Sequence, residues 1–310
     1  MKTFDALVIG GGPAGMTAAL YLVRSGLEVA MAEKLAPGGQ ILMTHFIENY
    51  PGFPEGIEGW KLAEIFAKHL ESYTLARLND EVRAIRPREG AHEIQVGQEW
   101  VQARAVVICT GVRYKHANIP GEKALLGRGV SYCALCDGNF FRDQPVAVIG
   151  GGNTALEESL YLARLVKKLY LIHRREDFRA QKCYQNRCEI NNCIEILRSS
   201  SVEEIIGSDQ VEGVMVKHLQ TGERKRLDVN GVFIFVGSEP QAGFFPPELE
   251  VDQSGFIIVN QKYRTNIPGI YAAGDVCAKT VRQVATAVGD GAAAASGVIG
   301  YLETLGHHSS

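Results

Sequence analysis

The sequence lacks a strong charge of either sign. Its 310 residues carry 32 lysines and arginines against 35 aspartates and glutamates, which gives a formal net charge of −3. A nucleic-acid-binding domain would normally carry a basic excess, so we expect no nucleic-acid partner. Hydrophobic residues make up 46% and charged residues 22% of the chain, which is typical of a globular protein with room for about two domains.

An uninterrupted apolar span is also missing. The best candidate, Ala6–Val23, has 18 residues without a formal charge, close to the minimum for a membrane-spanning helix. However, Gly10-Gly11-Gly12-Pro13 lies in its middle and would break such a helix. No small-residue cleavage pattern follows a basic start. We therefore interpret the segment as strand, turn and helix, and expect a cytoplasmic protein with no membrane partner.

A regular cysteine framework is absent as well. The seven cysteines are an odd number, which favours a reducing compartment with mostly free thiols. Cys183, Cys188 and Cys193 recur every five residues, but such steps drift off one helix face, so we interpret them as free thiols and not as a metal site. The histidines of the Gly306–Ser310 tail are expected to lie in a frayed end and not to bind metal.

What the sequence does contain is an internal repeat. Leu7-Val8-Ile9-Gly10-Gly11-Gly12-Pro13-Ala14-Gly15 matches Ala147-Val148-Ile149-Gly150-Gly151-Gly152-Asn153-Thr154-Ala155 at an offset of 140 residues. The match continues with Leu20-Tyr21-Leu22 against Leu160-Tyr161-Leu162. Each copy predicts a buried strand, a glycine turn, an apolar helix and a second strand, which is the first half of a Rossmann unit.

A further motif shows how the two copies are arranged along the chain. Gly269–Asp275 lies far beyond the second copy, and an alanine-rich helix follows from about Val284 to Leu302. The expected fold class is therefore α/β, with two Rossmann-like three-layer nucleotide-binding domains, the second inserted into the first. Residues 1–113 and 244–310 would form the first domain and residues 114–243 the second. Other short strands are predicted, among them Val82–Ile85, Val211–Lys217 and Phe256–Val259.

The two glycine loops predict two dinucleotide sites. The pattern positions are Gly10, Gly12 and Gly15 (GxGxxG) in the first copy and Gly150, Gly152 and Ala155 (GxGxxA) in the second. The first position makes the tight turn, the second lets backbone N–H groups approach a pyrophosphate, and the third keeps helix and strand close. The phosphate would lie at a helix N-terminus, where free N–H groups favour an anion. Two purely structural turns are the alternative, which the shared register makes less attractive.

The residue after the second strand differs between the copies. In the first copy it is Glu33, whose carboxylate can accept hydrogen bonds from ribose hydroxyls and would repel a 2′-phosphate. In the second copy it is His173, followed by Arg174, Arg175 and Arg179, and guanidinium groups bind phosphate through charge-assisted hydrogen bonds. A solvated basic patch is the alternative. The aligned exchange favours FAD in the first loop and NADPH in the second.

Cys133-Ala134-Leu135-Cys136 is the remaining motif with chemistry. Its spacing allows a disulfide or a redox dithiol, whereas zinc would need two more ligands, and neither a second CxxC nor paired histidines lies nearby. Asp137 follows at once and could supply a proton to a leaving thiolate or cap the following turn. Cys109 and Cys277 lie in apolar segments and are interpreted as structural.

Taken together, these residues resemble the low-molecular-weight, bacterial-type thioredoxin reductases of the class II pyridine nucleotide-disulfide oxidoreductase family, over nearly the whole chain. The inserted CxxC and the basic cluster make the resemblance specific. The motifs that carry it are the Gly10–Gly15 loop, Gly38-Gly39-Gln40, Glu48-Asn49-Tyr50-Pro51-Gly52, Thr110-Gly111, Cys133-Ala-Leu-Cys136-Asp137, Gly150–Ala155, His173-Arg174-Arg175 with Arg179, Gly274-Asp275 and Arg282-Gln283.

The resemblance implies a reaction and its residues. Hydride would pass from NADPH to FAD, two electrons would reach the CxxC disulfide, and the dithiol would reduce thioredoxin or a thioredoxin-like protein. The implied catalytic residues are Cys133, Cys136 and, as acid, Asp137. The implied FAD residues are Gly10, Gly12, Pro13, Ala14, Gly15, Glu33, Gly38, Gly39, Gln40, Asn49, Thr110, Gly111, Gly274, Asp275, Arg282 and Gln283. The implied NADPH residues are Gly150, Gly152, Asn153, Thr154, His173, Arg174, Arg175 and Arg179.

The resemblance also implies a homodimer and a rotating inserted domain. One flavin must meet the nicotinamide and the disulfide in turn, while the dithiol must also reach a protein, so a hinge is the economical solution. We expect hinges near Val112–Lys115 and Gly243–Pro246. Arg128 matches a position that helps to contact thioredoxin, and is otherwise an ordinary surface arginine.

Other functions remain open from the sequence. The arginine cluster and the absence of an N-terminal dithiol domain count against an NADH-dependent reductase of a peroxidase system. Ferredoxin–NADP reductases of related fold lack the CxxC. A flavin-linked reductase or oxidase of another dithiol protein remains an alternative, as does a non-catalytic redox sensor that binds FAD and NADP.

Overall fold

The computed structural model describes residues 1–44 and 46–307, so the tail from His308 onwards lies outside the described residues. Contacts within the chain divide it into two compact units. The first unit consists of Met1–Arg113 with Glu239–Ser310, and the second is the continuous segment Tyr114–Ser238.

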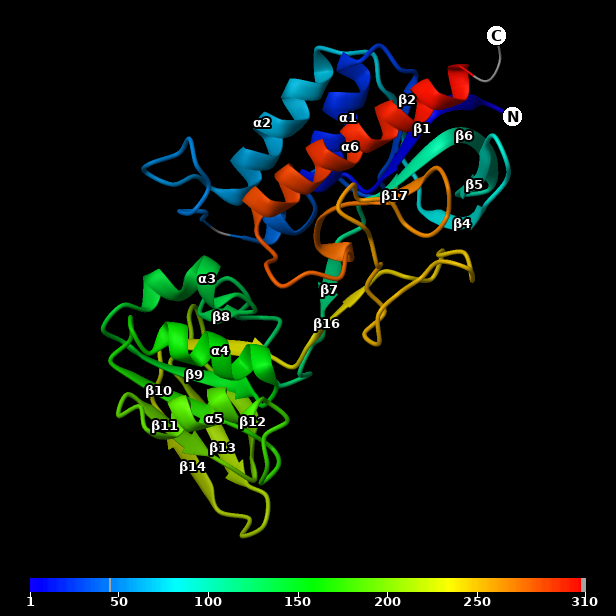
Figure 1. Ribbon diagram of the computed structural model, residues 1–310. Coiled ribbons are helices and arrows are strands. Elements are labelled where there is room, and N and C mark those ends of the chain that lie inside the picture. Colours follow the sequence, from blue (N-terminus) through cyan, green and yellow to red (C-terminus); the bar gives the residue numbers. More distant parts are fainter. Residues whose placement is uncertain (45, 308–310) are drawn as a thin grey trace. The chain divides into compact units, whose positions relative to one another are not determined.

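The two segments that join the units pair with each other. β7 (Val112–Tyr114) and β16 (Ser238–Pro240) form a two-stranded sheet (Figure 1). The chain therefore leaves the second unit a few residues before residue 244, where the sequence puts the domain boundary.

A seven-stranded sheet forms the centre of the first unit, in the order β3-β2-β1-β6-β5-β4 with β17 also paired to β6. The long strand β6 has two kinds of neighbour, because it pairs in parallel with β1 and β17 and antiparallel with β5. The strands are β1 (Thr3–Ile9), β2 (Val29–Ala32), β3 (Ala76–Leu78), β4 (Val82–Arg86), β5 (His92–Val96), β6 (Glu99–Ile108) and β17 (Ile270–Ala272). The helices are α1 (Pro13–Arg24), α2 (Gly59–Glu71) and α6 (Val284–His307), with 3-10 turns η1 (Gly39–Met43) and η3 (Gly274–Val276).

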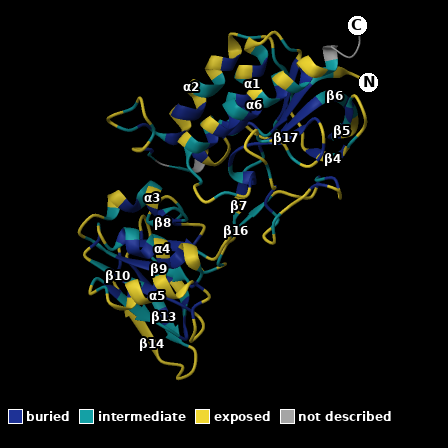
Figure 2. Ribbon diagram, viewed as in Figure 1, coloured by how far each residue is buried: buried dark blue, intermediate teal, exposed yellow. Residues whose placement is uncertain are grey.

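Side chains alternate between the two faces of this sheet, as expected for strands buried on both sides. Ala6 and Val8 of β1 pack towards α1 and α6, whereas Leu7 and Ile9 pack with β4, β5 and residues between 244 and 277. Figure 2 shows the strands buried and the helices exposed on their outward side. The first unit therefore has three layers with the sheet in the middle.

The second unit repeats this plan around a parallel sheet in the order β11-β10-β9-β15-β8. Val146 and Val148 of β9 pack with α4 and α5, and Ala147 packs with the antiparallel sheet β12-β13-β14. The strands are β8 (Val130–Ser131), β9 (Pro145–Gly150), β10 (Lys168–Ile172), β11 (Ile194–Leu197), β12 (Ser200–Ile206), β13 (Gly213–His218), β14 (Arg224–Leu227) and β15 (Gly231–Phe235). The helices are α3 (Ala134–Asp137), α4 (Asn153–Leu162) and α5 (Lys182–Glu189), with a 3-10 turn η2 (Gly138–Phe141).

The α/β class and both strand–turn–helix–strand repeats are confirmed. The strand expected at Phe256–Val259 is wrong, because this segment makes only isolated bridges through Ile257. The carboxylate of Asp252 accepts the N–H groups of Ser254 (2.8 Å) and Phe256 (3.0 Å), which closes a turn where the strand should begin. The C-terminal helix continues to His307, beyond the expected Leu302. In the part of the chain that the structure describes, no helix is long and apolar enough to cross a membrane.

Candidate functional site

The first glycine loop joins β1 to α1 in a shape that only glycine permits. Gly10 has φ +104°, and a Cβ there would lie 2.5 Å from the Cys109 carbonyl oxygen. A Cβ on Gly15 would lie 1.8 Å from the Gly10 carbonyl oxygen, so α1 packs directly on the turn. At Gly12, by contrast, a Cβ would meet nothing within 4 Å. The loop therefore has an open side at the start of α1, where a pyrophosphate would find free N–H groups.

Glu33 is fixed beside this loop by two hydrogen bonds. The β1–β2 register pairs Ile9 with Ala32. Glu33 therefore follows β2 at the same level of the sheet at which Gly10 follows β1. The N–H of Gly11 donates to Glu33 Oε2 (2.7 Å) and that of Leu35 to Oε1 (2.9 Å). The backbone thus holds the carboxylate at the position from which a ribose is bound in this type of loop.

Other residues expected at the flavin converge on the same loop. A Cβ on Gly274 would lie 2.8 Å from that of Ala14, and Thr110 Cα is 3.1 Å from the Cβ position of Gly10. Thr110 Oγ1 and Asp275 Oδ1 are buried and have no hydrogen-bond partner among the described residues, although the Lys279 ammonium lies 3.3 Å from that oxygen. Burial raises the pKa of Asp275 despite Lys279. Two such acceptors beside the loop fit a ligand with hydroxyl groups.

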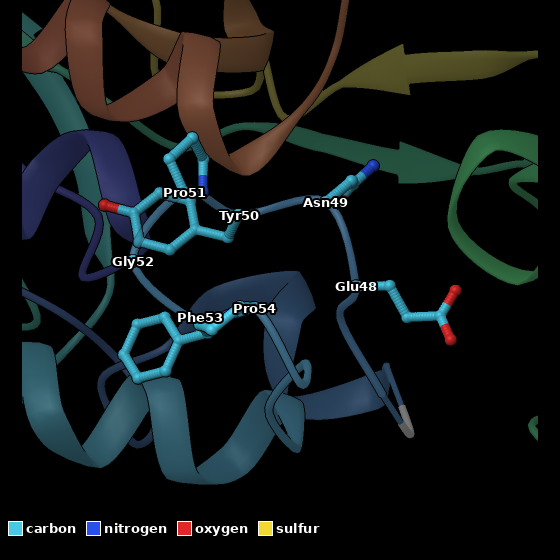
Figure 3. Close-up of a pocket in the computed structure, with 7 residues that line it drawn as sticks. All are labelled: Glu48, Asn49, Tyr50, Pro51, Gly52, Phe53 and Pro54. Atoms are coloured by element: carbon cyan, nitrogen blue, oxygen red, sulfur yellow. The ribbon is translucent and has the colours of Figure 1, made fainter.

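The Glu48–Pro54 loop brings Asn49 to the start of α6. This loop lines a hollow of about 310 Å³, in which the rings of Tyr50 and Phe53 lie to one side and Asn49 points away from them (Figure 3). Asn49 Nδ2 donates to Gln283 Oε1 (3.1 Å). Arg282 stacks 4.2 Å from the Phe256 ring centroid, and its Nε donates to the Asp275 carbonyl (3.3 Å).

The segment Gly38–Gln40 lies next to the first glycine loop. The N–H of Gly38 donates to the Gly11 carbonyl (2.7 Å), and a Cβ on Gly39 would lie 3.1 Å from Gly12 Cα. Gln40 Nε2 donates to the Val112 carbonyl. All the residues that the family resemblance assigns to the flavin thus belong to the first unit.

The second glycine loop has a matching geometry but different neighbours. The β9–β10 register pairs Ile149 with Ile172, so His173 stands where Glu33 stands in the first copy. His173 is buried, lies 5.0 Å from the Phe178 ring and would lie 2.2 Å from a Cβ on Gly151. Burial lowers its pKa. His173 therefore supports the loop as a neutral ring and does not offer a cationic charge.

The arginines near this loop are exposed. Arg174, Arg175 and Arg179 all reach solvent, and the N–H of Arg179 donates to the Gly151 carbonyl (2.9 Å). Asn153 Oδ1 accepts the N–H of Gln181 (2.7 Å), which ties the segment after Arg179 to the start of α4. Three exposed arginines thus follow the strand β10 next to a loop that has no carboxylate at the Glu33 position.

Cys133 and Cys136 form a disulfide with a Cα–Cα distance of 5.3 Å. Cys133 precedes α3 in an extended conformation, and its Sγ accepts the N–H of Cys136 (3.1 Å). Both cysteines are half-buried, and Leu135 between them is 39% exposed. The disulfide therefore lies on a short turn in which neither cysteine is fully buried.

Asp137 is connected to this turn through Ser131. The buried Ser131 hydroxyl donates to Asp137 Oδ2 (2.6 Å) and accepts the N–H of Cys133 (3.0 Å). The N–H of Asp137 donates to the Cys133 carbonyl (3.1 Å). The expected acid is thus held at the end of the turn that carries both cysteines.

Two residues at this turn escaped the sequence analysis. Ser131 is one, and Glu158 of α4 is the other, since its carboxylate accepts the N–H groups of Ala134 and Leu135. The available signal for Glu158 was its spacing of three from Ala155 and four from Leu162, which puts it near the inward face of the helix. A hydroxyl two residues before a CxxC gives no comparable signal.

The other cysteines are free thiols, as predicted for Cys183, Cys188 and Cys193. Burial raises the pKa of Cys109 far above its usual range, that of Cys277 to about 12 and that of Cys188 to about 11. A thiol must ionise to act as a nucleophile, so these buried thiols are inert. Within residues 1–44 and 46–307, no three His, Cys, Asp or Glu side chains are grouped as a metal site.

Comparisons with known proteins agree with one another. The pattern of the family described as pyridine nucleotide-disulphide oxidoreductase matches residues 4–291. The thioredoxin reductase of Treponema pallidum (strain Nichols) is 41% identical over 302 residues, covering 97% of this chain and 98% of that protein. The crystal structure of thioredoxin reductase from Streptococcus pyogenes MGAS5005 has a TM-score of 0.94 and 44% identity, covering 97% and 99% of the two chains. That of Giardia duodenalis has a TM-score of 0.93 and 32% identity, covering 98% and 100%. Together with the paired glycine loops and the disulfide, these matches place the chain in the pyridine nucleotide-disulphide oxidoreductase family, among its thioredoxin reductases.

Proposed function

We propose that this protein is an NADPH-dependent thioredoxin-disulfide reductase that contains FAD. A flavin and a pyridine nucleotide follow from the family, and the thioredoxin reductase relatives support thioredoxin or a thioredoxin-like protein as the substrate. The observation that carries the proposal is the half-buried Cys133–Cys136 disulfide, which lies in the same unit as the second glycine loop. We further propose that the enzyme acts as a cytoplasmic homodimer.

The residues of the first unit would bind FAD. The open side at Gly12 suits the pyrophosphate, and Glu33 suits the adenosine ribose. Thr110 Oγ1 and Asp275 Oδ1 would receive hydroxyl donors. When bound, a flavin supplies a two-electron relay between nicotinamide and disulfide.

The second glycine loop would select NADPH over NADH. Arg174, Arg175 and Arg179 are exposed and close to the loop, so they can surround a 2′-phosphate with charge-assisted hydrogen bonds. A carboxylate such as Glu33 would repel that group, and the neutral ring of His173 does not.

The cysteine pair would transfer electrons by thiol–disulfide exchange. Two electrons open the Cys133–Cys136 bond, and one of the resulting thiolates attacks a sulfur of the substrate disulfide to form a mixed disulfide. The second cysteine then displaces the reduced substrate and closes the original bond. Asp137, bound to Ser131 beside the turn, would donate the proton that the leaving thiolate takes up.

Replacing Cys136 by serine tests this assignment. We expect Cys136→Ser to abolish thioredoxin reduction, because no disulfide can form, while NADPH still bleaches the yellow protein under anaerobic conditions. Cys183→Ser is the matched control, since Cys183 is exposed and free, and it should turn over like the wild type. Retained thioredoxin reduction in Cys136→Ser would remove the mechanism.

A steady-state assay separates the competing functions. Purified protein is supplied with NADPH or NADH and with several disulfide proteins. A peroxidase-system reductase would prefer NADH, a dithiol oxidase would consume oxygen, and a redox sensor would consume almost no NADPH with any acceptor. The arginines at the second loop favour the NADPH-dependent reductase among these.

A further inference from the structure

The four N–H groups of α3 all have identifiable acceptors. The N–H of Asp137 donates to the Cys133 carbonyl (3.1 Å) and that of Cys136 to Cys133 Sγ (3.1 Å). The N–H groups of Ala134 and Leu135 donate to the carboxylate of Glu158 on α4. Because the first N–H groups of a helix have no acceptor within it, they need partners from outside. Glu158 is therefore the side chain that caps the turn between the two cysteines.

The same carboxyl group has one buried oxygen without a partner. Glu158 Oε2 is inaccessible to solvent and, among the described residues, makes no hydrogen bond. An ionised carboxylate in this position bears a desolvation cost that protonation removes. Burial and then repulsion from Glu157 raise the pKa of Glu158 from 4.5 to about 7, while the two backbone N–H groups act in the opposite direction.

Several charged and titratable groups lie on the elements that pack against α4. Glu157 is the one that shifts the pKa of Glu158, and Asp137 is bound to Ser131. The groups are Glu157 and Tyr161 on α4, Cys133, Cys136 and Asp137 at α3, Lys182, Cys183, Tyr184, Arg187, Cys188 and Glu189 on α5, and Lys168 and Tyr170 on β10. A thiolate at either cysteine would thus be a second anion on the turn that Glu158 already caps.

We propose that Glu158 is a positioning residue that takes up a proton when the Cys133–Cys136 disulfide is reduced. Two electrons break the S–S bond, one sulfur takes a proton, the other remains a thiolate, and the Glu158 carboxylate takes a second proton. Reoxidation by a substrate disulfide returns both protons with the two electrons. Among Glu158 and the two sulfurs there is then one anion in either redox state. This inference rests on the redox role proposed above for the disulfide.

The sign and the pH range follow from the two states. With the disulfide closed, Glu158 ionises near pH 7, and a thiolate nearby raises its pKa further. Well below pH 7 the carboxyl is protonated in both states, so reduction takes up no extra proton. From about pH 7 upward, until the reduced state also ionises, reduction takes up one extra proton. The equilibrium constant for reduction then falls by an extra tenfold per pH unit, which is 29.6 mV for a two-electron couple.

Equilibrium titration of the disulfide tests this inference without NADPH or thioredoxin. The flavin-loaded full-length protein is equilibrated anaerobically with dithiothreitol buffers of set potential from about pH 6 to about pH 9. Differential alkylation and peptide mass spectrometry then give the reduced fraction of the peptide with Cys133 and Cys136, separately from the free cysteines. In the wild type, the equilibrium constant for reduction of the disulfide should fall by the extra factor of ten per pH unit above about pH 7.

Two glutamine variants make the result specific. Glu158→Gln keeps an acceptor oxygen for Ala134 and Leu135 but cannot titrate, so the extra pH dependence should vanish. Glu157→Gln removes the neighbouring charge, so the extra dependence should remain and begin at a lower pH. A Glu158→Gln profile equal to that of the wild type overturns the proposal, as does loss of the effect in Glu157→Gln.

Infrared difference spectra of the wild type cover the case in which Glu158→Gln does not fold. Reduction should produce the band of a protonated carboxyl group at pH 7.5, and its absence overturns the proposal. Because neither experiment uses NADPH or thioredoxin, a failure here leaves the proposed function standing. A disulfide that NADPH cannot reduce would instead overturn that function.

Discussion

Glu122 is a buried carboxylate close to the cysteine turn. It accepts hydrogen bonds from the Tyr132 hydroxyl, from the N–H groups of Ala117 and Ile119 (both 3.1 Å) and from His116 Nδ1 (3.2 Å). Burial opposes its ionisation, but these hydrogen bonds outweigh burial and hold the pKa of Glu122 below its usual value. Tyr132 immediately precedes Cys133, so this network fixes the start of the turn.

We expect Glu122→Gln to lower the free energy of unfolding at pH 7 by about 1–3 kcal/mol. The amide NH₂ group of glutamine is a donor, and it would face buried N–H and O–H donors that now bind a carboxylate. The pKa of Glu122 is depressed in the folded state, so its contribution is present above the ordinary pKa of 4.5 and is lost as pH falls through the lowered value. The gap in Tm between variant and wild type should therefore narrow from pH 7 to pH 4. The exposed Glu212 provides the control: Glu212→Gln should show no such gap, and a Glu122→Gln gap independent of pH would contradict the account.

Arg175 is the residue at which nucleotide choice can be measured. Its side chain is exposed beside the second loop, and a lost charge-assisted hydrogen bond costs about 1.5–3 kcal/mol. Arg175→Ala should raise KM for NADPH by about tenfold to a hundredfold and leave KM for NADH nearly unchanged. Arg187→Ala, an exposed arginine on α5, should alter neither. An equal increase in KM for NADPH and NADH in Arg175→Ala would show that this arginine stabilises the fold and does not recognise the 2′-phosphate.

At the scale of elements, α6 packs against α1 through a glycine. A Cβ on Gly291 would lie 2.2 Å from the Ala14 carbonyl oxygen, whereas one on Gly289 would meet nothing within 4 Å. Gly291→Ala must push a backbone atom and should cost about 1–3 kcal/mol or more. Gly289→Ala should be neutral or stabilising by up to about 1 kcal/mol. Since Ala14 belongs to the first glycine loop, Gly291→Ala should also lose flavin.

Tm measures the change in stability, and the flavin-to-protein absorbance ratio after gel filtration measures the loss of flavin. Similar behaviour of Gly291→Ala and Gly289→Ala would refute the close contact between Gly291 and Ala14.

Elements with a local signal were predictable, and those without one were not. Both β–turn–α–β repeats follow from apolar runs that meet glycine turns, and the equivalence of Glu33 and His173 follows from their shared offset. The strand expected at Phe256–Val259 failed because turn hydrogen bonds to Asp252 outweigh an apolar run. Ser131 was missed because the sequence carries no signal for its hydrogen bond to Asp137. Glu158 was missed because helix spacing indicates its inward face but not its contact with α3. The packing of His173 against Gly151 could not be predicted either, since it is a tertiary contact.

At the scale of the whole molecule, the first unit is built from two separate segments of the chain. The sequence predicted this because the Gly269–Asp275 motif lies beyond the second repeat, while the exact crossing depends on how β7 and β16 pair. Each unit has its own apolar interior: the clusters around Val146 and Ala147 contain only residues of the second unit. The chain therefore passes between two units whose apolar interiors are packed separately.

This organisation predicts that residues 114–238 fold without the rest of the chain. The ends of the segment already lie side by side, because the N–H of Lys115 donates to the Gly237 carbonyl (2.9 Å), so excision leaves no long loop to close. The isolated segment should melt cooperatively by circular dichroism, form the Cys133–Cys136 disulfide, bind NADP⁺ more tightly than NAD⁺ by calorimetry, and bind no flavin. Arg175→Ala in the same segment should erase the difference between the two nucleotides. A segment that melts without cooperativity would mean that the first unit is needed to complete its core, and a well-folded segment indifferent to the 2′-phosphate would mean that the arginines at the second loop serve another purpose.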